Sequence, residues 1–262
     1  MTSIEVFNQW GSELLSLLAL KTSPIAVRFL RSASEVPEGA LCPRRDRGYH
    51  IAQCQAFGLS RQQRQSVALL KEDHWCWAPI DAYGLVPPLT EPPAAASAMV
   101  SSPDAARRLW AKYPRLEYGR YVGTVTAPVE TANFEPDLVL AYMNSAQLRS
   151  CLLAIKYTEG ALVRSEFDPI DSCVFCTIPT LLTGEYRITM PDPGDYERAM
   201  ASEDEIILTV PAAKLDSLVA GLQRFKRQGT TSRPRATEIQ PDFPQPPFYR
   251  DLFRQWGLDA PK

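Results

Sequence analysis

The chain has 262 residues, of which 45% are hydrophobic and 22% charged, the balance of a folded globular protein and not of a disordered one. Its 28 Lys and Arg against 30 Asp and Glu give a net charge of −2, which excludes the global positive field of a sequence-independent nucleic-acid binder. No segment approaches the roughly 20 apolar residues of a membrane span, and residues 14–20 lack the flanks of a secretory signal. We therefore expect a cytoplasmic protein that binds neither nucleic acid nor membranes.

Hydrophobic periodicity predicts alternating helices and strands in the first half of the chain. Proline at the first turn of a helix places Cys76 at a strand-to-helix junction. In chain order we expect a helix over 3–20, a strand over 25–30, a loop over 32–48, a helix over 49–59, a strand over 66–70, a helix beginning near Pro79, a proline-rich surface loop over 87–103 and a helix over 103–113.

In the second half of the chain, the apolar run over residues 136–142 is typical of a buried strand and predicts the centre of a β-sheet. The other expected elements are strands over 121–127, 161–167 and 205–210 and helices over 145–157, 173–182 and 211–225. This order favours an α/β or α+β fold, a single domain over residues 1–228 in which helices cover a mixed sheet. Residues 229–262 read as a proline-rich tail, with an aromatic cluster at its end, that packs back on the body.

Cysteine and histidine group in an unusual way. The two histidines each lie beside a cysteine, as His50-x-x-x-Cys54 and His74-x-Cys76. Residues i and i+4 share a helix face and alternate residues share a strand face, so each pair can point one way. Cys173 and Cys176 form a C-x-x-C pair that can reach one metal or one cluster. In a cytoplasmic chain we expect no structural disulfide, and packed core thiols are the alternative to ligands.

Other catalytic motifs are absent from the sequence: it has no dinucleotide or P-loop glycine pattern, no G-x-S-x-G and no H-E-x-x-H. A redox pair with Cys173 at a helix start is an alternative to metal ligation. Asp168 and Asp171 precede Cys173, and Glu72 and Asp73 precede His74. Such carboxylates can serve as proton donors or support ligands, although turn and capping chemistry explains Asp171 well.

Several collinear motifs between residues 10 and 225 resemble a bacterial and archaeal family, domain of unknown function 169. The matching segments are residues 18–27, Cys54-Gln55, His74-Trp75-Cys76, 133–140, 182–185, 203–206 and 210–211. The resemblance implies thiols near Cys54, Cys76 and Cys173 and a fourth in a later Gly-Cys-x-Gly-Ser-Arg segment.

This sequence departs from the family pattern at the fourth thiol, because the corresponding segment, residues 188–198, contains no cysteine. Three explanations are open. Cys176 supplies the missing ligand, or the site keeps three cysteines and one open position, or this chain has lost the cofactor.

The residues and the resemblance together favour an iron–sulfur enzyme, an oxidoreductase or a lyase. Cys54, Cys76 and Cys173, with Cys176 as the fourth candidate, would hold a [4Fe–4S] cluster. An iron without a cysteine can bind a substrate as a Lewis acid or pass electrons to it. His74 or Asp171 is the predicted proton donor. The expected partners are a small-molecule substrate and an electron-donor protein, and a homodimer is compatible with the sequence.

Two alternatives belong to other classes of protein. One is a structural or binding module with a tetrahedral zinc on Cys173, Cys176 and one His/Cys pair. The other is a metal-free protein that binds a small molecule beneath the proline-rich loop. In that case the residues lining an apolar pocket would be Tyr49, Trp75, Trp77 and Tyr83.

Overall fold

The computed structural model describes residues 3–229 and 246–258 and divides the chain into two compact units, Met1–Gln228 and Gly229–Lys262. The first unit is built on a six-stranded sheet with the order β2-β3-β1-β4-β6-β5. Its strands are β1 (Ile25–Leu30), β2 (Val67–Leu70), β3 (Gly123–Pro128), β4 (Leu138–Met143), β5 (Arg187–Thr189) and β6 (Ile206–Pro211). All neighbouring strands pair antiparallel. The fold is therefore α+β, and the expected mixture of parallel and antiparallel strand pairs is not found among these strands.

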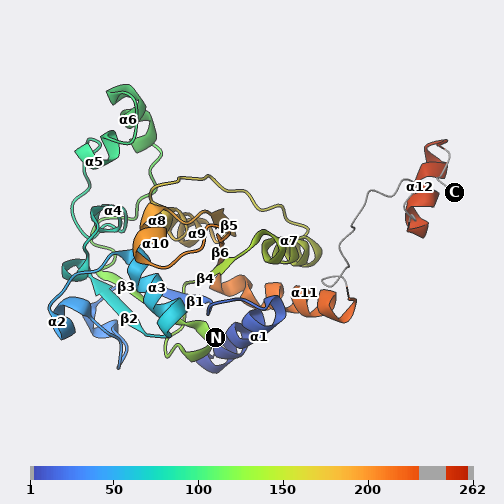
Figure 1. Ribbon diagram of the computed structural model, residues 1–262, viewed down its shortest axis with the longest axis horizontal. Helices are drawn as coiled ribbons and strands as arrows, with labels where there is room; N and C mark the ends of the chain where they lie inside the picture. The colour runs from blue at the N-terminus through green and yellow to red at the C-terminus, as the bar shows by residue number, and fades with distance from the viewer. Residues whose placement is uncertain (1–2, 230–245, 259–262) are drawn as a thin grey trace. The chain divides into compact units, whose positions relative to one another are not determined.

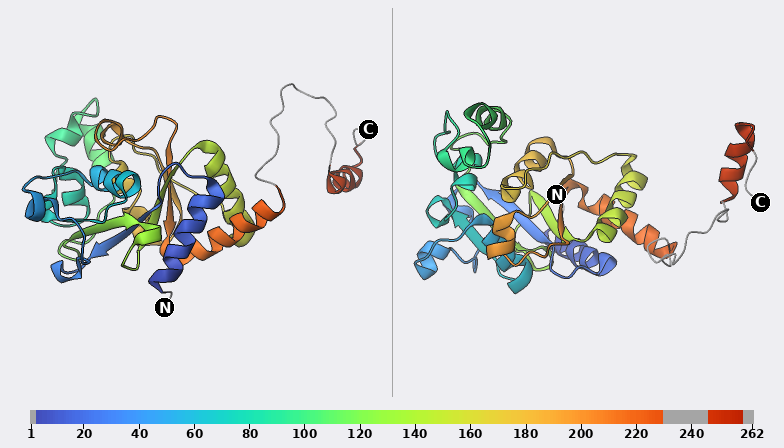
Figure 2. Two further views of the ribbon diagram at one scale, coloured as in Figure 1. Left: turned by 60° about the horizontal axis from the view of Figure 1, so that its bottom comes forward. Right: turned by 45° about the horizontal axis from the view of Figure 1, so that its top comes forward.

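Helices cover both faces of the sheet (Figure 1). Three long helices pack on one face and are grouped on one side of the strands in Figure 2: α1 (Ile4–Leu18), α7 (Ser145–Glu159) and α11 (Leu215–Arg227). Around the opposite face and its edges lie α2 (Pro43–Arg47), α3 (Gln53–Gln63), α4 (Trp77–Ala82), α5 (Ala94–Ser97), α6 (Pro103–Trp110), α8 (Ser172–Phe175), α9 (Ile178–Thr183) and α10 (Pro193–Arg198).

Alternation along the central strands produces two separate cores. In β4, Val139, Ala141 and Met143 face the three long helices, whereas Leu138, Leu140 and Tyr142 face the opposite side. Successive side chains of a strand point to opposite faces of the sheet, so a strand that is buried on both faces reads as a continuous apolar run. The prediction that 136–142 lies at the sheet centre is confirmed, since β4 pairs with both β1 and β6.

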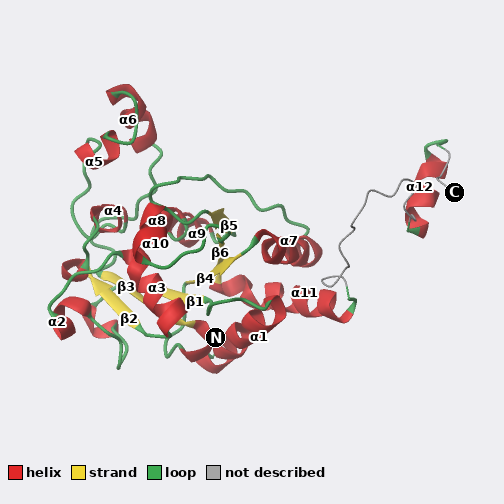
Figure 3. Cartoon of the chain, viewed as in Figure 1, coloured by secondary structure: helices red, strands yellow, loops and turns green. Residues whose placement is uncertain are grey.

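The predicted strand over residues 161–167 is wrong. This segment is part of the long loop between α7 and α8 (Figure 3). Ser165 Oγ accepts a hydrogen bond from Ile188 N at 2.6 Å, and Arg187 Nη1 donates to Arg164 O at 2.8 Å. Side chains therefore attach the segment to β5, and no backbone ladder forms between them. The strand at this edge of the sheet is β5, which the sequence did not indicate.

The predicted helix over residues 49–59 begins four residues late, at Gln53. Backbone hydrogen bonds hold Ile51 extended: its N–H donates to Asp73 O at 3.0 Å, and its carbonyl accepts from Trp75 N at 2.9 Å. His50 thus lies outside α3, and the expected shared helix face with Cys54 does not exist. Pro211 is the last residue of β6 and does not begin α11, contrary to the sequence prediction. The predicted helix over residues 173–182 is two short helices, α8 and α9.

In the second unit, α12 (Pro247–Gln255) contains most of the predicted aromatic cluster. Phe248 and Tyr249 meet edge to face with ring centroids 4.7 Å apart. Most of the proline-rich stretch expected to pack back on the body, residues 230–245, lies outside the described residues. Within the described ranges, no helix has both the length and the apolar composition that a membrane span requires.

Candidate functional site

A cavity of about 230 Å³ brings together most of the residues that the sequence singled out. Its walls come from the start of α3, the start of α4, the α5–α6 region, the loop before α8 and the start of α10. The lining residues are Ala52, Gln53, Cys54, Cys76, Trp77, Ala96, Met99, Leu109, Trp110, Tyr113, Asp168, Ile170, Asp171, Cys173, Asp192, Pro193, Gly194 and Arg198. Five segments of the chain thus meet at one place, which we call the cysteine pocket.

Each thiol of the cysteine pocket stands at the start of a helix. Cys54 is the second residue of α3, Cys173 is the second residue of α8, and Cys76 immediately precedes α4. Cys54 and Cys173 are buried, and Cys76 is half-buried. The predicted set of three thiols is therefore assembled in space, although up to 119 positions of sequence separate its members, from 54 to 173.

A fourth helix start, that of α10, completes the pocket without a thiol. Gly194 is the second residue of α10, as Cys54 and Cys173 are of their helices. The Gly-Cys-x-Gly-Ser-Arg segment that the resemblance implies has its cysteine four positions before the arginine, which is the spacing of Gly194 and Arg198. A Cβ at Gly194 would stand 2.1 Å from Arg198 Nη2, so the guanidinium fills the room that a side chain at 194 would take. Gly194 therefore adjoins Arg198.

Burial keeps these thiols protonated. It raises the pKa of Cys54 to about 12 and also raises the pKa of Cys76 and of Cys173. The carboxylates of Asp192 and Asp171 add to the rise at Cys173. An attacking thiolate needs a lowered pKa, so the burial of Cys173 does not favour a redox pair in which it is the nucleophile. A metal centre supplies the positive charge by which a coordinating thiol loses its proton.

Asp171 lines the pocket and is linked to Tyr113, whose hydroxyl donates to Asp171 Oδ2 at 2.9 Å. Burial raises the pKa of Asp171 to about 6, so this carboxyl group can take up or release a proton near neutral pH. Asp171 stands at the N-cap of α8, but its side chain makes no capping hydrogen bond; Asp168 Oδ1 holds the preceding turn by accepting from the N–H groups of Ile170 and Asp171, and Asp192 Oδ2 accepts from Ser172 N at 2.9 Å. Of the two predicted proton donors, Asp171 is the one in contact with the cavity.

The other candidate residues lie outside the cysteine pocket. His74 is buried, neither ring nitrogen has a hydrogen-bond partner among the described residues, and desolvation lowers its pKa to about 4. Cys176 is fully buried in the core, with Sγ 3.5 Å from Cys173 O. His50 is exposed and lines a separate pocket beside Tyr49. The explanation in which Cys176 replaces the missing family thiol is therefore not supported.

Three thiols and three carboxyl groups line the cysteine pocket. Within the described residues, no group of three His, Cys, Asp or Glu side chains could hold one metal ion. A tetrahedral zinc needs four such ligands around one centre, so the site expected on Cys173, Cys176 and a His/Cys pair does not fit. In a [4Fe–4S] cluster each thiolate holds a different iron, so its ligands surround a volume. Cys54, Cys76 and Cys173 come from separate elements and line one cavity, which is the kind of arrangement that cluster ligands have.

The rest of the wall is apolar and aromatic. Trp77 and Trp110 lie with ring centroids 6.2 Å apart, and Trp110 stacks on Tyr113 at 5.2 Å. Ala96 and Met99 come from the proline-rich segment that was expected to cover a pocket. Of the aromatic residues expected there, Trp77 takes part, whereas Trp75 is exposed and Tyr83 is fully buried in the core.

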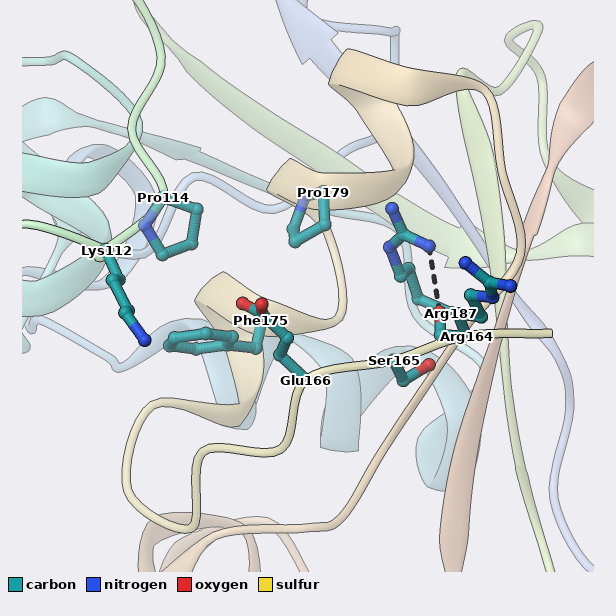
Figure 4. A pocket seen from close by; sticks show the side chains of 8 residues that line it. All are labelled: Lys112, Pro114, Arg164, Ser165, Glu166, Phe175, Pro179 and Arg187. Carbon is teal, nitrogen blue, oxygen red and sulfur yellow. Dashed lines mark hydrogen bonds between the residues drawn. The ribbon is translucent and has the colours of Figure 1, made fainter. Parts of the chain in front are cut away.

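A second cavity, of about 320 Å³, contains no thiol (Figure 4). Lys112, Arg164 and Arg187 make it cationic, and Glu166 is the one carboxylate of its lining. Phe175, part of its wall, contacts Tyr113 of the cysteine pocket edge to face at 5.9 Å. This cavity therefore adjoins the cysteine pocket and does not share its chemistry.

Comparison with known proteins places the chain in a family. The family domain of unknown function 169, described as "Uncharacterised ArCR", matches residues 13–221, and the chain belongs to it. The uncharacterised protein MJ0308 of Methanocaldococcus jannaschii is 23% identical over 226 residues, covering 84% of this chain and 95% of that protein. No solved structure gives a significant match.

Proposed function

We propose that this protein is an iron–sulfur enzyme that acts on a small molecule in the cysteine pocket. The observation that carries the proposal is that three thiols from three helix starts open into one cavity, next to a fourth helix start that offers Gly194. Cys54, Cys76 and Cys173 would hold the cluster, and one iron would have no cysteine. When bound, such a cluster supplies a Lewis-acidic iron or an electron to the substrate.

The remaining residues of the pocket have roles that follow from their positions. Asp171 would exchange a proton with the substrate, and its hydrogen bond from Tyr113 fixes the carboxyl group in place. Trp77, Trp110 and Leu109 form an apolar wall that limits water in the cavity. Arg198 places a positive charge at the corner without a thiol.

The first test is purification of the full chain without oxygen, followed by iron, zinc and acid-labile sulfide analysis and a visible spectrum. We expect about four irons and four sulfides per chain. Cys54→Ala, Cys76→Ala and Cys173→Ala should each lose most of the iron. Cys42→Ala and Cys151→Ala are matched controls, because both thiols are buried outside the cavity, and they should keep it. An iron-free protein, or equal iron loss in both sets, would refute the proposal.

The open corner has its own test in Gly194→Cys. The new side chain meets the end of a flexible arginine, which can swing aside, and Asp192 Oδ1 at 2.9 Å, which must shift slightly. In the iron-loaded variant we expect the introduced thiol to resist iodoacetamide, and to react once a chelator has removed the metal. Equal reactivity before and after metal removal would show that position 194 does not adjoin the cluster.

A second candidate function is metal-free binding of a small molecule. The aromatic wall of Trp77, Trp110 and Tyr113 favours it, since such walls are typical of ligand pockets. The metal analysis separates the two candidates. Stable, iron-free protein that still binds a ligand after Cys→Ala substitution at 54, 76 and 173 would favour the metal-free alternative.

A further inference from the structure

One end of the cysteine pocket presents hydrogen-bond donors that lack partners. Gln53, the first residue of α3, lines the cavity and is 1% exposed. Its Oε1 accepts from the hydroxyl of Thr124 at 3.0 Å, whereas its Nε2 has no partner in the described part of the chain. A buried donor without a partner costs stability, and such groups in native proteins call for an explanation. An acceptor atom of a bound ligand would supply the missing bond.

The start of α3 adds further donors at the same end. Ala52 is the N-cap, and its methyl side chain accepts no hydrogen bond from the first turn, although Gln55 Oε1 accepts from Ala52 N at 2.9 Å. The first N–H groups of a helix have no partner within the helix, and their shared dipole attracts acceptor oxygens. Ala52, Gln53 and Cys54 all line the cavity. The α3 start and the free amide of Gln53 therefore point to an acceptor beside Cys54.

The charges around the cavity select the kind of acceptor. Arg198 is the one cationic residue of the lining, and its Nη2 lies beside Gly194 at the start of α10. Asp168, Asp171 and Asp192 line the same cavity. Three carboxyl groups against one guanidinium oppose a second anion, so an uncharged oxygen suits this pocket better than a carboxylate.

The aromatic part of the wall favours a flat apolar group. Trp77 and Trp110 form part of its wall together with Met99 and Leu109. Arg115 lies 3.9 Å from the ring centre of Trp110 and is held by an ion pair with Asp81 at 3.0 Å, which helps to fix the ring. Fixed aromatic rings accept planar partners by stacking.

We propose that the cysteine pocket binds a planar, uncharged carbonyl compound, such as an aryl amide or ketone. Its oxygen accepts from Gln53 Nε2 and Arg198, and its ring lies on Trp77 and Trp110. The inference rests on the proposed function in one respect: it takes this cavity as the place where the substrate binds.

The test compares benzamide with toluene, which lacks the oxygen, and with benzoate, which adds a negative charge. Binding to the full chain is followed by tryptophan fluorescence. We expect benzamide to bind at least about tenfold more tightly than either of the others. Equal binding of toluene would overturn the role of the donors, and tighter binding of benzoate would overturn the choice of an uncharged oxygen.

The decisive variant is Gln53→Glu, which keeps an acceptor for Thr124 and replaces the free donor by an oxygen. Gln55→Glu is its matched control, because it makes the same change two residues further along α3. Gln55 is outside the lining of the cavity and uses Oε1 to accept from Ala52 N at 2.9 Å. We expect benzamide affinity to fall about tenfold in Gln53→Glu and less than twofold in Gln55→Glu. Equal effects of the two variants would overturn the proposal.

A second variant and a metal assay keep the outcomes separate. Arg198→Met, at a partly exposed side chain, should weaken benzamide and leave toluene unchanged, and it tests the donors even if Gln53→Glu fails to fold. Iron and sulfide are measured on the same samples. Iron-loaded protein whose benzamide affinity is unaffected by both variants would overturn the substrate class and leave the cluster. Iron-free protein whose benzamide binding depends on Gln53 would overturn the cluster and leave the substrate class.

Discussion

Replacing Arg61 by methionine should cost about 3–5 kcal/mol of unfolding free energy, because the change strands a buried carboxylate. Arg61 Nη1 lies 2.9 Å from Glu205 Oε1, and the two side chains are only 1% and 6% exposed. Arg61 also donates to Met200 O at 3.0 Å, and its guanidinium lies 4.0 Å from the ring centre of Tyr142. In the variant, Glu205 would keep a single hydrogen bond, from Ser202 N at 2.9 Å.

The magnitude follows from removing one partner of a buried pair, which is much more costly than removing both. Urea unfolding followed by circular dichroism measures the loss against a total of about 5–15 kcal/mol for a typical domain. The double variant Arg61→Met/Glu205→Met should recover most of it. Lys21→Met is the matched control, because Lys21 and Asp204 form an exposed pair at 3.7 Å, and it should show little change.

Two results would refute this reasoning. One is a loss for Arg61→Met no greater than that for Lys21→Met. The other is a double variant whose loss equals the sum of the single losses, since that would mean that the two charges do not interact.

The Arg61 substitution should also affect the cysteine pocket. Arg61 connects α3, which carries Cys54, to the chain just after α10, which carries Gly194, so the variant should also weaken ligand binding in the cysteine pocket.

Three further changes test other parts of the fold. Gly123→Ala should destabilise by about 1–3 kcal/mol, measured by urea unfolding, because its Cβ would stand 2.1 Å from the backbone oxygen of Leu69 on β2; unchanged stability would contradict the close approach. Asn144→Ala should cost about 0.5–2 kcal/mol, since Asn144 Oδ1 caps α7 by accepting from the N–H groups of Ala146 and Gln147; Ser150→Ala, later in the same helix, is the control in the same assay. Burial raises the pKa of Asp137, so its ionised form costs stability above that pKa. Asp137→Asn should therefore be more stable than the natural chain at neutral pH, and the gain should vanish as the pH falls below the ordinary carboxyl pKa; a gain that grows on acidification would contradict the direction of the shift.

The local sequence pattern was sufficient to predict the long helices and the central strand of this fold. Helical periodicity predicted α1, and the apolar run predicted β4, because both signals come from residues close in sequence. The short or edge elements were missed. Residues 161–167 have a strand-like composition, yet Ser165 and Arg187 attach them to β5 through side-chain hydrogen bonds that no local pattern reveals.

The site was predicted in part. Family motifs and carboxylate positions indicated Cys54, Cys76, Cys173 and Asp171, which do line one cavity. Gln53, Trp110, Gly194 and Arg198 were not named as site residues. A signal for two of them was present, since the family pattern puts a cysteine four residues before an arginine, and this chain has Gly194 and Arg198 at that spacing.

The sequence by itself determined the long helices, the central strand of the sheet and the grouping of cysteine with histidine, because composition and periodicity act through neighbouring residues. Only the tertiary structure decided which thiols meet. Cys176 stands three residues from Cys173, yet the one-turn helix α8 turns Cys176 into the core. Cys54 and Cys76 reach the cavity from elements packed on the same face of the sheet. Which side of a short helix is buried depends on what packs against it, and those partners are distant in sequence.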